Sequence, residues 1–207
     1  MSRYIIALDC SFTRTGIAIL DTIEKKLYFE TASEKIGEKQ FENVFHAAKS
    51  IVNQLKKIFE SYGDDYDLIM EAPLPMSSMS AALYSLDTLI YNEFESHVKA
   101  TFNPATLRSK IHGHKYEKKD SQNLANKYIN ILSNSMYKIL SVMGTKRKIC
   151  HDCCEAFLYL HLYLKMQGHK DFQFDNSQEI AAYKQRMKQL KEREKLLLKE
   201  EQSNERI

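Results

Sequence analysis

The stretch YIIALDCSFTRTGIAIL, residues 4–20, decides the fold. Its first apolar run ends at Asp9, and a second run begins at Thr15 after a segment with the composition of a turn. Residues 26–31 then alternate between apolar and polar side chains, as a half-exposed strand does. We therefore expect three strands joined as a β-meander, with a carboxylate at the end of the first strand.

Beyond the meander, apolar residues recur at intervals of three and four in several segments, which predicts helices. Gly63 ends the first of these helices, and Pro73 and Pro75 end a buried strand that leads into Glu71. The last helix of this part is apolar nearly all round, so we expect it to be buried. The predicted elements are helices over residues 41–62, about 78–96, 119 to about 140 and 151–167, and strands over residues 66–70 and 98–102.

This order of elements predicts an α/β fold: a mixed five-stranded sheet with helices on both faces. The 207 residues allow one ordinary domain, which we place at residues 1–170. Residues 171–207 are predicted to form an extra, charged C-terminal helix outside that domain. The sequence leaves open whether its apolar stripe packs back, pairs with a second chain or stays loose. The stripe consists of Ile180, Tyr183, Met187, Leu190 and Leu197.

The composition excludes several classes of protein. A hydrophobic fraction of 43% excludes wholesale disorder, and six Gly and three Pro are too few for a turn-rich all-β chain. No stretch approaches the roughly 20 apolar residues of a membrane helix, and the N-terminus is too soon acidic for a signal peptide. Four Cys without an export signal predict free thiols. We therefore expect a soluble protein of the bacterial cytoplasm, or of the host cytoplasm for a phage-encoded chain.

Positive charge is concentrated in one part of the chain. Residues 99–149 hold eleven Lys or Arg and two acids, a balance of +9, whereas the whole chain has +3. A basic block inside an otherwise balanced protein predicts a surface that faces phosphates, although a solvated Lys-rich face would have the same composition.

Four acidic residues stand at positions where the predicted elements end or begin. Asp9 and Glu71 end strands, and Asp152 and Glu155 share one face of the first turn of the buried helix. Burying such acids is costly unless a cation compensates, and Mg²⁺ prefers oxygen ligands of this kind. Each acid also has a simpler role: Asp9 as an acceptor in the turn, Asp152 as a helix N-cap, and Glu155 as a partner of Lys or Arg.

With these residues in view, the chain resembles the RuvC family of Holliday-junction resolvases, within the ribonuclease-H-like superfamily. The segments that carry the resemblance run in the family's order from Tyr4 to about Leu164. They are IIALDCS at 5–11 with TGIA at 15–18, LIME at 68–71, FNPA at 102–105 with IHG at 111–113, Lys119, and DCCEAF at 152–157. Ser11 replaces the family's usual Gly, and Glu155 replaces its last Asp. Leu74 and Met76 stand where bacterial members place an aromatic wedge. Together with the composition, these departures look more like a phage or viral member than a cellular one.

The resemblance implies a metal-dependent endonuclease that nicks branched DNA, above all Holliday junctions, by paired symmetric cuts. Three-way and flap structures are further candidate substrates. Asp9, Glu71, Asp152 and Glu155 would hold two Mg²⁺ ions, with Mn²⁺ as a substitute, and Lys119 would offset charge at the scissile phosphate. Resolution by two symmetric nicks implies a homodimer. The residues expected to line the duplex backbone are Arg108, Lys110, Lys115 and Lys118.

Three other interpretations remain beside this one. Cys150, His151, Cys153 and Cys154 invite a zinc site, but neighbouring helix positions point about 100° apart. Asp9 with Thr15 and Gly16 also resembles the first phosphate loop of actin-like sugar kinases, yet no second glycine-containing loop follows. A catalytically silent protein that binds branched DNA, or a scaffold, would explain the basic block but would leave the four acids without a role.

Overall fold

The computed structural model describes residues 2–34, 44–72, 80–107, 110–111, 118–141 and 149–175, and pairs of helical residues between 177 and 193. The first three strands form the predicted meander: β1 (Tyr4–Asp9), β2 (Thr15–Asp21) and β3 (Lys26–Ala32) pair antiparallel in sequence order. β4 (Tyr66–Glu71) and β5 (Val98–Phe102) add to the β1 side, each parallel to its neighbour. The α/β class with a mixed sheet is therefore confirmed.

A sixth strand, β6 (Lys138–Ser141), pairs parallel with β3 at the opposite edge, which gives the order β5-β4-β1-β2-β3-β6. The predicted count of five strands and the predicted helix end at about Leu140 were both wrong here. Helix α4 (Lys118–Asn134) ends six residues earlier. The Ser135 hydroxyl donates to the Leu132 carbonyl (2.6 Å) at this end, and Tyr137 is buried just before the strand.

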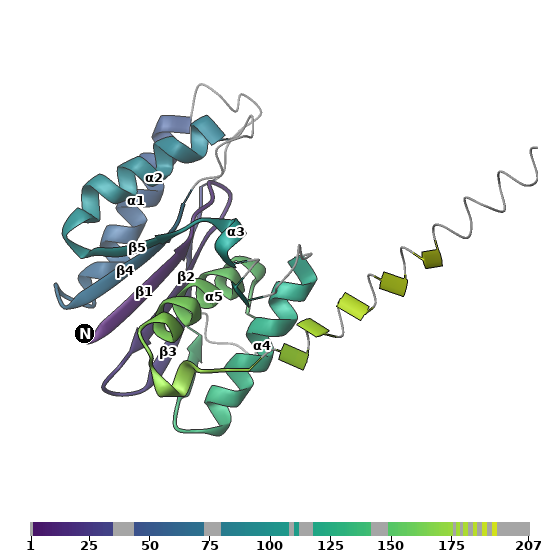
Figure 1. The fold of residues 1–207 in the computed structure, drawn as a ribbon. Helices are drawn as coiled ribbons and strands as arrows, with labels where there is room; N and C mark the ends of the chain where they lie inside the picture. Colours follow the sequence, from purple (N-terminus) through teal and green to yellow (C-terminus); the bar gives the residue numbers. More distant parts are fainter. Residues whose placement is uncertain are drawn as a thin grey trace, which may run out of the picture.

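Helices cover both faces of the sheet (Figure 1). α1 (Val44–Glu60) and α2 (Ser80–Phe94) lie on one face, where they pack against Ile6, Leu8, Ile17 and Ile19 of the two central strands. α4 and α5 (His151–Met166) lie on the other face, where α5 packs against the alternate residues of the same strands and α4 packs beside α5. The short α3 (Pro104–Leu107) begins after Asn103, whose side chain accepts from the Ala105 N–H (2.8 Å). The described residues also include the 3-10 helices η1 (Glu95–His97) and η3 (Lys170–Phe172).

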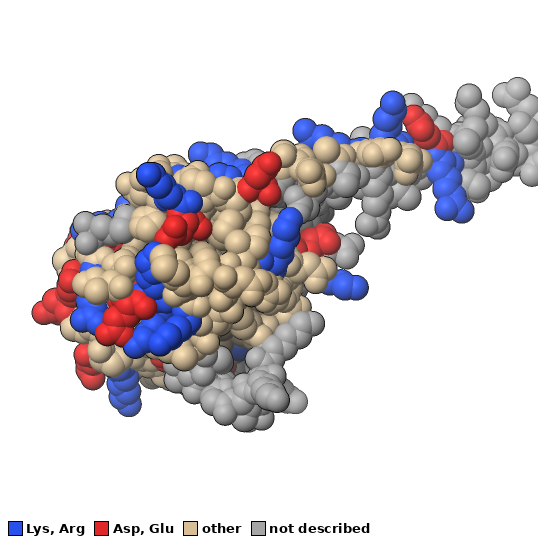
Figure 2. Space-filling model, turned by 90° about the horizontal axis from the view of Figure 1, so that it is seen from below, with Lys and Arg blue, Asp and Glu red and all other residues tan. Residues whose placement is uncertain are grey.

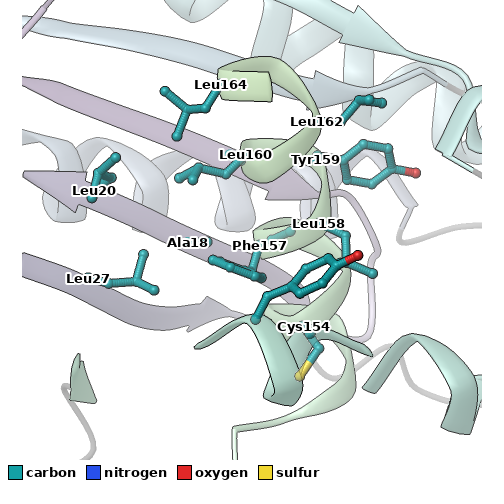
Figure 3. Packing of buried hydrophobic residues seen from close by; sticks show 14 of the residues in the cluster. Ala18, Leu20, Leu27, Cys154, Phe157, Leu158, Tyr159, Leu160, Leu162 and Leu164 are labelled. Carbon is teal, nitrogen blue, oxygen red and sulfur yellow. The ribbon is translucent and has the colours of Figure 1, made fainter. Parts of the chain in front are cut away.

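Helix α5 is buried along nearly its whole length, as its apolar sequence predicted. In Figure 3, Phe157, Leu160 and Leu164 lie on the side of α5 that faces β2 and β3. Tyr159 leaves the helix on another side and stacks on Phe102 of β5, with ring centroids 6.4 Å apart. The sheet and the remaining helices therefore fix α5 from several directions, and whatever its first turn carries is held in place.

Residues just beyond 170 pack on this core. The side chain of Phe172 is fully buried, and Phe174 stacks on Tyr128 of α4 with ring centroids 4.5 Å apart. The domain boundary at residue 170 remains a prediction, but a truncation there would remove Phe172 from the core. Residues described between 177 and 193 are helical and extend away from the body of the domain (Figure 1). Of the apolar stripe, only the side chain of Ile180 is described. Within the described residues, no helix has both the length and the apolar character to span a membrane.

Candidate active site

The parallel pairing of β1 and β4 brings the first two acids together. Leu8 of β1 lies opposite Met70 of β4, so the next residues along, Asp9 and Glu71, come level at the carboxyl ends of β1 and β4. Their side chains are hydrogen-bonded to each other. The carboxyl ends of parallel strands are where α/β folds place their ligands, and the two acids occupy that edge.

The first turn of α5 reaches the same edge because β2 has a glycine there. Gly16 is the antiparallel partner of Asp9. A Cβ atom on Gly16 would lie 2.1 Å from the backbone carbonyl carbon of Asp152 and 2.6 Å from the backbone nitrogen of Cys153. Only a residue without a side chain lets the helix approach the strand this closely. Gly16 therefore sets the distance between the turn that carries Asp152 and the end of β1.

The other three acids lie near enough to Asp9 for their charges to act on its carboxyl. Burial raises the pKa of the Asp9 carboxyl well above its usual range, and the hydrogen bond to Glu71 raises the pKa further. The negative charges of Glu71, Glu155 and Asp152 act in the same direction. Glu155 is itself buried, at 6% exposure. The structure thus brings together the four carboxylates that the sequence indicated, two from strands and two from α5.

Two of the simpler roles considered for these acids, the turn acceptor and the helix N-cap, are filled by other residues. In the turn after β1, the Thr15 hydroxyl donates to the Ser11 carbonyl (2.8 Å) and accepts from the Ser11 N–H (3.2 Å). Cys150, not Asp152, is the N-cap of α5, and its sulfur accepts from the Cys153 N–H. Glu155 has His151 as a neighbour, with 3.6 Å between His151 Nε2 and Glu155 Oε1.

Arg14 is a residue of this site that the sequence analysis missed. It lies in the turn between β1 and β2, half-exposed, and its Nε donates to Oδ2 of Asp152. The ion pair joins residues 138 positions apart. The one local signal was a cation in the same turn as Asp9, directly before Thr15 and Gly16. In this structure, the Arg14 guanidinium supplies the positive charge next to Asp152.

Asp87 is a second residue that was missed. This acid lies in the middle of α2 at 8% exposure, and within the described residues its Oδ1 has no hydrogen-bond partner. Burial raises the pKa of the Asp87 carboxyl to about 7, and the nearby charge of Glu71 adds to this shift. The sequence held a signal: Asp87 stands in the apolar stripe of the helix, between Leu83 and Ile90. Asp87 is hydrogen-bonded to the thiol of Cys10, the residue that follows Asp9 at the end of β1.

The residues present fit a hard divalent cation in their donor chemistry. Carboxylate oxygens are the preferred ligands of Mg²⁺ and Mn²⁺, and a cation would offset the repulsion among these partly buried carboxylates. Within the described part of the chain, no group of three His, Cys, Asp or Glu side chains is already arranged to hold a metal ion. Arg14 forms an ion pair with Asp152 in this structure, so these side chains would rearrange locally when a cation binds.

The predicted phosphate-facing residues are placed only in part. Lys119 is exposed in the first turn of α4, and it shares a helix face with Gln122, whose Nε2 donates to the Ile149 carbonyl (3.1 Å) just before α5. The exposed Lys110 is described, whereas Arg108, Lys115, the side chain of Lys118, Leu74 and Met76 lie outside the described residues. On the face shown in Figure 2, basic and acidic side chains are interspersed.

Comparisons with known proteins identify the fold. No protein-family model matches this chain, and no curated protein matches it in sequence. The structure of Thermus thermophilus RuvC in complex with a Holliday junction substrate has a TM-score of 0.53 to this chain at 11% identity, and covers 80% of this chain and 96% of its own. A second Thermus thermophilus RuvC structure gives 0.53 at 12% identity with the same coverage. The human cytomegalovirus terminase nuclease domain, Mn soaked and inhibitor bound, gives 0.38 at 10% identity, over 79% of this chain and 81% of its own. The chain therefore has the ribonuclease-H-like fold of RuvC, as the resemblance implied.

Proposed function

We propose that this protein is a divalent-metal-dependent endodeoxyribonuclease that resolves Holliday junctions by paired symmetric nicks. The observation that carries the proposal is the convergence of Asp9, Glu71, Asp152 and Glu155 at one edge of the sheet. The fold shared with RuvC, one structure of which holds a Holliday junction substrate, supports the choice of substrate. The basic block between residues 99 and 149 supports a nucleic-acid substrate independently.

In this proposal, the four carboxylates hold two Mg²⁺ ions, for which Mn²⁺ substitutes. Bound ions of this kind activate a water and stabilise the leaving 3′ oxygen in phosphodiester hydrolysis. Asp9 and Glu71 are positioned by β1 and β4, and Asp152 and Glu155 are positioned by the first turn of α5. Asp152 would hold a cation in place of its ion pair with Arg14, and the half-exposed guanidinium beside the site would then be free to contact phosphate.

Lys119 is proposed to offset charge on the scissile phosphate, because its turn of α4 is bound to the segment that precedes α5. Arg108, Lys110, Lys115 and Lys118 are proposed to line the duplex backbone, which fixes position rather than sequence. Two symmetric nicks require two active sites related by a two-fold axis, so the working unit is proposed to be a homodimer in the cytoplasm.

The test is cleavage of a synthetic four-way junction, labelled on one strand at a time, in Mg²⁺, Mn²⁺ or EDTA. The proposal expects nicks at symmetric positions on two opposed strands, only with a divalent ion, and with ends that a ligase reseals because the leaving group is the 3′ oxygen. Four amide variants should each abolish nicking while leaving junction binding largely intact: Asp9→Asn, Glu71→Gln, Asp152→Asn and Glu155→Gln.

Asp67→Asn is the matched control. Asp67 is also a buried acid of β4, but it accepts from Ser2 (2.9 Å) near the other end of the strand. This variant should therefore keep its nicking activity. Full cleavage by any two of the four site variants would refute the carboxylate site. Tight junction binding by the wild-type protein without nicking in either metal would instead support a catalytically silent branched-DNA-binding protein.

A further inference from the structure

The first turn of α5 carries a pair of cysteines that the proposed reaction does not use. Cys150 and Cys153 are three positions apart, so they lie on the same side of the helix. Their sulfurs are 3.1 Å apart. The Sγ atom of Cys150 also accepts from the backbone N–H of Cys153 at 3.4 Å. The N-cap arrangement thus points the sulfur of Cys150 into the turn and toward its partner.

A disulfide between these residues needs little movement. The S–S bond is about 2.05 Å long, so the two sulfurs must approach by about 1 Å. Cys153 is anchored, because its thiol donates to the Glu30 carbonyl of β3 (3.1 Å) and its backbone lies against Gly16. Cys150 precedes the helix and has extended backbone angles, φ −68° and ψ 161°, so it is the partner able to move.

The two cysteines differ in exposure, as the two members of an exchange pair do. Cys150 is half-buried, whereas the other three cysteines of the chain, Cys10, Cys153 and Cys154, are buried. The sulfur of Cys154 lies 4.0 Å from the Ile149 carbonyl oxygen, to which it donates. An external reagent therefore reaches Cys150 first, and Cys153 is the nearest thiol that can resolve the product.

We propose that Cys150 and Cys153 form a reversible dithiol–disulfide pair that small-molecule disulfides oxidise. Cys150, as the thiolate, attacks one sulfur of the small disulfide, which breaks that S–S bond and releases one thiol. Cys153, having lost its proton to water, attacks Cys150 Sγ and releases the second thiol. The two electrons given up by the protein dithiol reduce the external disulfide to two thiols, so the exchange is balanced and a small thiol reverses it.

Oxidation has a consequence for Asp152, which lies between the two cysteines; this part rests on the proposed nuclease function. The backbones of Asp152 and Cys153 both lie against Gly16 without spare room, so closing the disulfide moves Cys150 toward Cys153 and shifts the Asp152 side chain within the strained turn. A displacement of about 1 Å at a catalytic group costs up to a hundredfold in rate. The oxidised protein should therefore nick junctions on the order of ten- to a hundredfold more slowly.

The experiment counts thiols in the full-length protein. The native protein is equilibrated with reduced or oxidised glutathione, quenched with acid, unfolded, alkylated and weighed by intact-mass spectrometry. The wild-type chain should take up four alkyl groups after reduced glutathione, one for each cysteine, and two fewer after oxidised glutathione. Cys153→Ser should instead retain one glutathione on Cys150, and Cys150→Ser, in which serine keeps the N-cap, should bind none. Cys154→Ser is the control and should still lose two alkyl groups on oxidation.

Full alkylation of the wild-type chain after oxidised glutathione would overturn the proposal, as would a disulfide that requires Cys154 or Cys10. Nicking is measured on the same samples: the oxidised wild type should slow and recover with dithiothreitol, whereas Cys150→Ser should not respond. A disulfide that forms without any change in nicking would refute the effect on Asp152. If even the reduced protein fails to nick, the nuclease proposal fails, while the thiol count still decides whether the pair exists.

Discussion

Replacing Gly16 with alanine should displace the first turn of α5 and so separate the two halves of the proposed site. The new Cβ atom would lie 2.1 Å from the Asp152 carbonyl carbon and 2.2 Å from the Asp152 carbonyl oxygen, and both are backbone atoms that no rotamer change can move away. To restore an ordinary contact of 3.4 Å, the turn must move by about 1.3 Å. Asp152 moves with it, while Asp9 stays on the sheet.

The expected size follows from the displacement. Overpacking a filled interior costs about 1–3 kcal/mol, which lowers Tm by roughly 3–9 °C for a chain of this length. A shift of about 1 Å in a catalytic group lowers the rate by about a hundredfold. We therefore expect a folded Gly16→Ala protein that melts several degrees earlier and nicks junctions about a hundred times more slowly.

The assay pairs thermal melting, with and without Mg²⁺, with single-turnover nicking of a labelled four-way junction. Gly168→Ala is the matched control: Gly168 has φ +75° with open space around it, so alanine strains the backbone by about 1–2 kcal/mol far from the carboxylates. The control should melt earlier to a similar degree and keep its nicking rate. A Gly16→Ala protein with unchanged Tm and a nicking rate within twofold of wild type would refute the role of this contact.

Three further predictions concern other parts of the molecule. The pKa of Asp9 in the folded protein lies above its ordinary value of 3.8, so the folded state binds this proton more tightly than the unfolded chain. The metal-free protein should therefore lose stability as pH rises from about 4 through the raised pKa. Urea titrations in EDTA should show this dependence of the unfolding free energy on pH, and Asp9→Asn should flatten it. Arg14→Ala should lower the Mg²⁺ concentration needed for half-maximal thermal stabilisation by about two- to fivefold, because it removes a partly exposed cation that competes for Asp152. An unchanged or higher Mg²⁺ concentration at half-maximal stabilisation would contradict this. Arg14→Lys is the control. Phe172→Ala should cost about 3–5 kcal/mol of unfolding free energy in a denaturant titration. Truncation after Asp175 should leave the midpoint of that titration nearly unchanged. Equal losses of stability from both changes would refute a domain end near residue 175.

The sequence was sufficient for the elements whose signals are local. The apolar runs of β1, β2 and β4 end at charged or turn residues, and the all-round apolar character of α5 required burial. Placing Asp9 and Glu71 at strand ends was enough to expect them at one edge, because parallel strands bring their carboxyl ends together. Asp87 could have been found in the same way, since an acid in an apolar helical stripe is itself a local signal.

The features that escaped prediction depend on distant partners. β6 has four residues, and what makes it a strand is its pairing with β3, more than a hundred positions earlier in the chain. The contact between Arg14 and Asp152 spans 138 positions, and neither residue alone indicates the other. The N-cap of α5 was also ambiguous, because Cys150 performs with sulfur a role in which Asp is more common.

The central position of α5 has a consequence during synthesis of the protein. The strands that hold Asp9 and Glu71 leave the ribosome long before residues 151–166, yet one face of their sheet stays uncovered until α5 packs on it. The same helix brings Asp152 and Glu155, so the event that completes the hydrophobic interior also completes the set of acids. A nascent chain therefore carries no assembled cutting centre while it is still being made, and the capacity to cleave DNA arises together with the resistance of the finished domain to unfolding.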